Sequence, residues 1–219
     1  MPCSKRSSAR GRPRAFDIDK GIEVAGRMFR ERGYDGVGVA ELVKAIGIKP
    51  PSFYAAYGSK KALLAQVLER YGSHDGSFVH RLCCRNSPLA ETAEKLFESA
   101  ARAYTSDPSA RGCLVMEGTR NCGDPEACAL TDKAHSELHD ELVTWISHQA
   151  PQAASELADY VLVVLAGMSA QARAGTGRDV LLTSARIAST GFRAELDRLG
   201  VAAVEVNGSE APDQKDHRN

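Results

Sequence analysis

The chain has no net charge, few aromatic residues and no long apolar run, and each absence narrows the range of functions. Its 28 Lys and Arg balance 28 Asp and Glu, and 6% of its 219 residues are aromatic. The longest apolar run, around residues 160–168, is far shorter than the roughly 20 residues that span a bilayer. No basic segment precedes an apolar stretch of the kind that directs export. We therefore expect a cytoplasmic protein with no membrane partner.

Signatures of catalysis are also missing. The sequence contains no nucleophile elbow, phosphate-binding loop, HExxH zinc motif or dinucleotide-binding fingerprint. Its six cysteines follow no disulfide-scaffold spacing, so free thiols in a reducing compartment are expected. We therefore predict that the protein is not an enzyme and that it requires no cofactor and no metal.

The zero net charge hides an uneven distribution along the chain. Residues 1–72 contain 14 Lys and Arg against 7 Asp and Glu, whereas the remainder contains 14 against 21. A basic N-terminal module attached to an acidic body is typical of a chain whose first part is attracted to a polyanion.

Helical periodicity runs along nearly the whole chain, and no alternating strand pattern interrupts it. Ile22, Ala25 and Phe29, for example, fall on one face of an expected first helix. We predict an all-α fold of about nine helices. It is divided into a disordered basic arm (1–14), a helical head (15–72), a helical body (73–200) and a disordered tail (201–219).

The segment 38–57 has the spacing of a helix-turn-helix motif. A short helix ends at Gly47, and Pro50 and Pro51 open a second one. Proline at the first helical position costs no hydrogen bond and fixes φ at a helical value, so the pair stiffens a helix that is too short to be stable alone. Because prolines donate no backbone N–H, phosphate contacts are expected from the side chains of Lys49, Ser52, Tyr54 and Lys60. Tyr57 is instead expected in the core.

Residues 16–72 resemble the DNA-binding region of TetR-family transcriptional regulators. The matching features are Gly33-Tyr34, Leu42 with Ala45-Ile46-Gly47, and Ser52-Phe53-Tyr54 followed by Tyr57-Gly58-Ser59-Lys60 and Ala62-Leu63-Leu64. A second, weaker resemblance covers Leu165–Gly175, which is similar to the penultimate helix of many members. Two departures are Val37-Gly38, where members often have Ser or Thr, and Tyr57-Gly58, where they have an aromatic residue and proline.

The resemblance implies a homodimeric, ligand-responsive repressor that binds a pseudo-palindromic double-stranded DNA operator. Its arm is similar to arginine-bearing arms that enter a minor groove. The residues that we expect to contact DNA are Arg12, Arg14, Lys49, Pro50, Pro51, Ser52, Phe53, Tyr54 and Lys60.

The resemblance also places an effector pocket and a dimer interface in the body. An unknown small molecule is expected to contact Tyr104, Met116, Arg120, Asn121, His135, Leu138 and Trp145. The last two helices of each subunit are expected to form a four-helix bundle, with the interface at Val161, Val164, Leu165, Met168, Ile187, Gly191 and Phe192.

Two alternatives remain open at this stage. His135 and His139 are spaced to share a helix face, and Cys113, Cys122 and Cys128 lie nearby in sequence, so a metal or a thiol oxidant is a possible trigger on the same fold. Two histidines on a solvated helix and cysteines used as small apolar residues explain the same pattern without a ligand. The other alternative is a helical adaptor or enzyme whose head has lost DNA binding.

Overall fold

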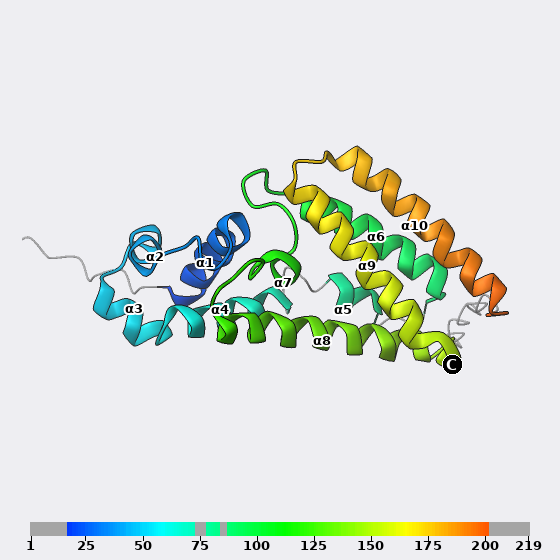
Figure 1. Ribbon diagram of the computed structural model, residues 1–219, viewed down its shortest axis with the longest axis horizontal. Coiled ribbons are helices and arrows are strands. Elements are labelled where there is room, and N and C mark those ends of the chain that lie inside the picture. The colour runs from blue at the N-terminus through cyan, green and yellow to red at the C-terminus, as the bar shows by residue number, and fades with distance from the viewer. Residues whose placement is uncertain (1–16, 73–77, 84–86, 202–219) are drawn as a thin grey trace, which may run out of the picture.

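The described residues of the computed structural model form an elongated, all-helical molecule (Figure 1). They are residues 17–72, 78–83 and 87–201, so the predictions for the arm, including Arg12 and Arg14, and for all of the tail except Val201 lie outside them. The elements are α1 (Ile18–Arg32), α2 (Val39–Ile46), α3 (Pro50–Tyr57), α4 (Lys60–Arg70), α5 (Phe78–Cys83), α6 (Leu89–Tyr104), α7 (Leu114–Glu117), α8 (Pro125–Ser147), the 3-10 turn η2 (Pro151–Ala153), α9 (Ala154–Arg173) and α10 (Arg178–Arg198).

The all-α prediction is confirmed, with one more α-helix than expected among the described residues. The addition is α5, a helix of six residues that is too short to show a periodic pattern in the sequence. At the other extreme, Pro151–Arg173 has the length and mean hydropathy, 1.4, of a membrane-spanning helix. Half of its most apolar window is buried inside the fold, where α9 packs on α6, α8 and α10, as expected for a core helix.

The head is built by α1, α2 and α3, with α4 leading into the body. The Asp17 side chain caps α1 by accepting the backbone N–H of Lys20 at 3.2 Å. Ile22, Ala25 and Phe29 are buried on one face of α1, as their spacing predicts. Figure 1 shows this head at one end of the molecule and the packed helices α6, α9 and α10 at the other.

The two helices of the motif are joined through a left-handed glycine. Gly47 has φ 79° and ends α2, and Lys49 is the N-cap of α3, which begins at Pro50 rather than at Pro51. Although Gly38 brings no side-chain cap to α2, the Glu41 carboxylate accepts the Gly38 backbone N–H at 2.9 Å. This bond is one half of a capping box, and it partly compensates for the absence of a Ser or Thr hydroxyl at the start of α2.

Tyr57 ties α3 to α1 through an unusually close approach. Its ring is buried, and its hydroxyl donates to the carbonyl oxygen of Ile18 at 3.1 Å. A Cβ added to Gly21 would lie 1.9 Å from the Tyr57 hydroxyl oxygen. Glycine is therefore required at position 21 for α1 and α3 to pack at this distance.

A Gly21→Ala variant is expected to lose about 1–3 kcal/mol of unfolding free energy, because the added methyl group overpacks the core by more than its gain in helix propensity. Urea unfolding measures the loss. Combining it with Tyr57→Phe removes the clashing oxygen, and the double variant should be more stable than the sum of the two single effects predicts. Strict additivity of the two losses would contradict the close approach.

Candidate functional site

The start of α3 presents a short polar and aromatic surface. Lys49, Pro50, Pro51 and Ser52 are all exposed, and the Tyr54 side chain is 53% exposed. The two prolines occupy the first two helical positions, so this surface is held by backbone stiffness as well as by packing. The structure therefore brings together five of the residues expected to contact DNA.

Phe53 does not belong to that surface, and its assignment as a DNA contact was wrong. Its side chain is 0% exposed, and its ring centroid lies 5.4 Å from that of Tyr57 inside the head. Tyr54 stands edge-on to Phe53, with centroids 5.5 Å apart. The buried ring thus supports the exposed one, which is a positioning role.

Lys60 lies at the first turn of α4 but does not point freely into solvent. Ser59 caps this helix by accepting the Ala62 backbone N–H at 3.0 Å. The Lys60 ammonium nitrogen lies 3.8 Å from the centroid of the Tyr34 ring, in a cation–π contact. This contact links the position of the Lys60 ammonium group to the segment that holds Tyr34.

Tyr34 and Asp35 form a joint between the head and the body. The Gly123 backbone N–H donates to one Asp35 carboxylate oxygen at 2.7 Å, and the Cys122 thiol donates to the other at 3.3 Å. The Tyr34 hydroxyl donates to Asp124 at 3.4 Å, and its backbone N–H donates to Gly118 at 2.8 Å. These contacts fasten the turn after α1 to the segment that leads into α8.

The electrostatics of this joint favour a neutral thiol. The Gly123 N–H and then the Cys122 thiol lower the pKa of Asp35, so the carboxylate stays charged and accepts both bonds. Burial, with Asp35 adding to it, raises the pKa of Cys122 to about 11. Cys122 therefore acts as a hydrogen-bond donor at neutral pH rather than as a reactive thiolate.

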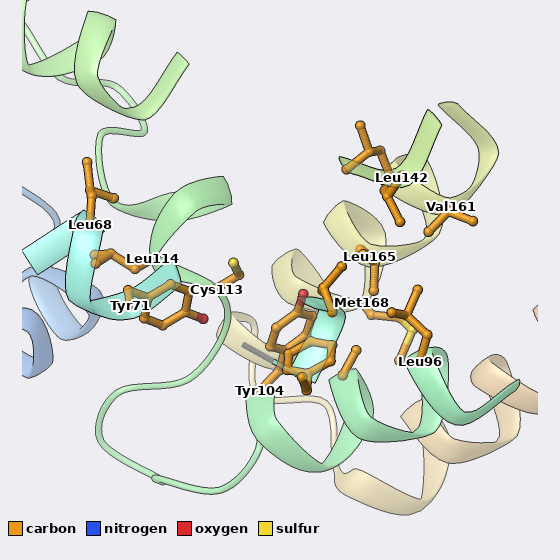
Figure 2. Close-up of a cluster of buried hydrophobic side chains, with 14 of the residues drawn as sticks. Leu68, Tyr71, Leu96, Tyr104, Cys113, Leu114, Leu142, Val161, Leu165 and Met168 are labelled. Carbon is orange, nitrogen blue, oxygen red and sulfur yellow. The ribbon is translucent and has the colours of Figure 1, made fainter. Parts of the chain in front are cut away.

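The residues proposed for a metal trigger do not converge. His139 lies 3.2 Å from Asp159 and 3.7 Å from Asp140. In the part of the chain that the structure describes, no group of three or more His, Cys, Asp or Glu side chains could hold a metal ion. Cys113 is buried beside Tyr71 and Tyr104 (Figure 2).

A cavity of about 670 Å³ lies within the body, bounded by α4, α5, α6, α7, α8 and α9. Figure 2 shows its inner end, where the hydroxyl groups of Tyr71 and Tyr104 lie on either side of Cys113. Leu68, Leu138 and Leu165 supply apolar wall. Charged side chains, among them Glu69, Lys133 and Glu141, also line the cavity. A cavity that combines apolar wall with polar groups is the usual form of a small-molecule site.

The wall contains two of the seven residues expected to contact an effector, Tyr104 and Leu138. The other five lie elsewhere: Met116, Arg120, Asn121, His135 and Trp145. Trp145 is a buried residue of α8, and its indole N–H has no hydrogen-bond partner among the described residues. Arg120 donates to the buried Glu117 carboxylate at 3.2 Å. The sequence instead missed Tyr71, on the turn after α4, and Val115, next to Cys113.

Four of the seven residues expected at the dimer interface are buried inside the chain and cannot meet a partner. They are Val161, Leu165, Met168 and Phe192. The exposed apolar side chains of the same two helices are Tyr160, Val163 (71% exposed), Val180 and Ile187 (59% exposed), with Gly191 also at the surface and Val164 partly buried. Ile187, Gly191 and Val164 thus stay available for an interface.

Comparison with known proteins agrees with this geometry. Residues 22–67 match the family model described as bacterial regulatory proteins, tetR family. The chain is 32% identical over 197 residues to the HTH-type transcriptional repressor BdcR of Escherichia coli strain K12, covering 90% of this chain and 100% of that protein. It is 29% identical to the HTH-type transcriptional repressor ComR of the same strain, covering 87% and 93% of the two chains.

Among solved structures, the chain is similar to a cysteine mutant of the TetR family transcriptional regulator CifR, complexed with a 26-base-pair double-strand operator DNA. The TM-score is 0.71 at 32% identity, covering 82% of this chain and 98% of that one. A helix-turn-helix head with an exposed, proline-stiffened α3, a helical body around a cavity and these relatives lead to one assignment. The chain belongs to the TetR family of DNA-binding transcriptional regulators.

Proposed function

We propose that the protein is a homodimeric, ligand-responsive repressor that acts in the cytoplasm, has no enzymatic activity and binds a pseudo-palindromic operator. The observation that carries the proposal is the exposed surface Lys49–Ser52 with Tyr54, at the start of a helix stiffened by two prolines. In a helix-turn-helix dimer, the second helix of each head enters a major groove, and the two grooves lie about 34–36 Å apart.

The proposed DNA contacts divide into two groups. Lys49, Ser52 and Tyr54 lie together on α3 and are proposed to reach base edges and the adjacent phosphates. Lys60 is proposed to contact a phosphate at the start of α4 once it leaves the Tyr34 ring. Phe53 is excluded from both groups because it is buried.

Fluorescence anisotropy with the DNA upstream of the protein's own coding sequence, followed by selection from a random DNA pool, tests this function. We expect tight binding to a two-fold symmetric site, with affinity falling steeply as salt rises, because phosphate contacts release counterions. Binding without sequence preference, or an affinity independent of salt, would argue against a sequence-specific regulator.

The proposed dimer interface is the exposed apolar face of α9 and α10. An uncovered Val163 and Ile187 on adjacent helices are unusual for a monomer and are explained by a second copy packed on them. A Val163→Glu variant is expected to raise the dimer dissociation constant by about tenfold or more, since it places a charge in an apolar contact. Sedimentation velocity measures the change. Thr144→Glu, at an exposed position of α8, is the matched control and should remain dimeric.

The 670 Å³ cavity is the proposed effector site. Its polar inner end, Tyr71, Tyr104 and Cys113, suits a mostly apolar molecule with one hydrogen-bonding group. Because Tyr71 directly follows α4, which connects the head to the body, a ligand against it is expected to shift the heads between two spacings. Such a ligand regulates only if it binds one spacing better than the other.

A further inference from the structure

A second cavity, of about 500 Å³, lies between the head and the body. Its walls come from α1, from the end of α4 and from the turn that follows α6. No residue of α2 or α3 lines it, so it is separate from the surface proposed to contact DNA. It differs from the effector cavity in that basic side chains outnumber acidic ones on its wall.

Four cations line this cavity: Lys20, Arg27 and Arg30 from α1, and Arg70 from the end of α4. Two carboxylates, Glu23 and Asp107, also lie on the wall, which leaves an excess of positive charge. Arg27 is paired with Asp107 at 2.9 Å, and Arg70 lies 3.5 Å from Asp19 at the edge. These pairs partly neutralise Arg27 and Arg70, whereas no carboxylate is paired with Arg30 in the described parts of the chain.

Arg30 is the arginine of this wall whose charge has no carboxylate partner among the described residues. Its Nε atom is buried and has no hydrogen-bond partner among the described residues. A buried, unpaired N–H is rare in native proteins because its desolvation is not compensated, and the charge on a guanidinium increases that cost. The backbone at Arg30 is held in place, since Arg173 of α9 donates to its carbonyl oxygen at 3.0 Å.

The surroundings of Arg30 provide further groups for an anion. Ser106 lies on the cavity wall, and the buried Tyr71 closes its inner side. The Ser109 backbone N–H, followed by Arg27 and Arg30, lowers the pKa of Asp107, which shows that the field of both guanidinium groups reaches this turn. Asp107 therefore stays ionised at neutral pH, and its negative charge offsets part of the positive charge on the cavity wall.

We propose that this cavity binds a small phosphate-type oxyanion, with the Arg30 guanidinium as its main anchor and Lys20 and Arg70 as further cationic contacts. Guanidinium groups match phosphate oxygens with paired, charge-assisted hydrogen bonds, and Arg30 lies on the cavity wall without an ion-pair partner among the described residues. The anion is either free inorganic phosphate or the terminal group of a phosphomonoester. Either one would connect α1 of the head with the turn after α6 of the body.

Isothermal titration of the full-length protein without DNA tests the site, with ionic strength held constant by sodium chloride. Inorganic phosphate and glycerol 3-phosphate are titrated separately. We expect one site per chain, with a dissociation constant in the millimolar range or below for at least one of the two. The tighter of the two identifies the source of the phosphate group.

Two pairs of variants locate the binding. Arg30→Gln is expected to weaken it by about tenfold or more, whereas Arg102→Gln, at an exposed position on α6 outside the cavity, should leave it unchanged. Ser106→Asp places a carboxylate on the cavity wall and is expected to weaken binding to a similar degree. Ser109→Asp adds the same charge to the same turn outside the wall and is its control.

Thermal unfolding of each variant establishes that it is folded. If Arg30→Gln does not fold, the comparison of Ser106→Asp with Ser109→Asp tests the proposal by itself. Absence of binding by both compounds, or binding that survives in every folded cavity variant, overturns the proposal. Because no DNA is present, neither result bears on operator binding, and a failure of one proposal leaves the other standing.

Discussion

A Phe53→Ala variant is expected to lose about 3–5 kcal/mol of unfolding free energy, and its DNA binding with it. The side chain is fully buried, and its removal leaves a cavity beside Tyr57 at the junction of α1 and α3. A helix of eight residues has little stability of its own, so α3 depends on this packing to form. Guanidinium unfolding followed by circular dichroism measures the loss.

The neighbouring Tyr54→Ala substitution is the matched control. It also removes an aromatic ring from α3, but from an exposed position, so its effect on stability is expected to be within about 0.5 kcal/mol. Operator affinity should fall in this variant while the protein remains folded. If Phe53→Ala were as stable as Tyr54→Ala, Phe53 would not be the core residue that supports the recognition surface.

A Lys49→Ala variant is expected to weaken operator binding by about 10- to 100-fold without affecting folding. Lys49 is exposed at the N-cap of α3 and makes no ion pair within the described parts of the chain, so its charge is available to DNA. Each lost phosphate contact reduces the salt slope by about 0.9, and a dimer loses two contacts. The slope of log affinity against log salt should therefore become shallower by about 2.

Lys95→Ala serves as the control for this measurement. Lys95 lies on α6 in the body, and its one ion pair, with Glu91, is at 3.9 Å on the exposed face. The variant changes the net charge by the same amount outside the head, so affinity and salt slope should both stay close to those of the unchanged protein. An equal loss in the two variants would show that overall charge, rather than a contact at α3, determines the affinity.

Sequence periodicity was sufficient for most of the helices, because each long helix buries one stripe of apolar residues. It was insufficient for α3, where Phe53 and Tyr54 are adjacent aromatic residues. Which one is buried depends on how α3 docks against α1, and that angle is fixed by Gly21 and by the hydrogen bond from Tyr57 to Ile18. Neither feature can be recognised from the spacing of apolar residues within α3 itself.

The same limit explains the corrections in the body. α9 is apolar on nearly all sides, so its pattern could not separate the buried Val161 from the exposed Val163. The cavity wall was misjudged for a related reason. Its residues come from six helices, and Tyr71 and Tyr104 are brought together only by the packing of α4 against the body. The Asp35–Cys122 contact joins residues that are 87 apart in the chain, a distance over which local patterns carry no information.

Tyr71 forms part of the wall of both cavities, the apolar one in the body and the basic one beside the head. Any molecule that displaces this ring changes the volume and polarity available to a molecule on its other side. Thermodynamic reciprocity then requires each ligand to alter the affinity of the other by the same factor. If each cavity has its own ligand, the occupancy of the operator would depend on the concentrations of both, one apolar and one anionic.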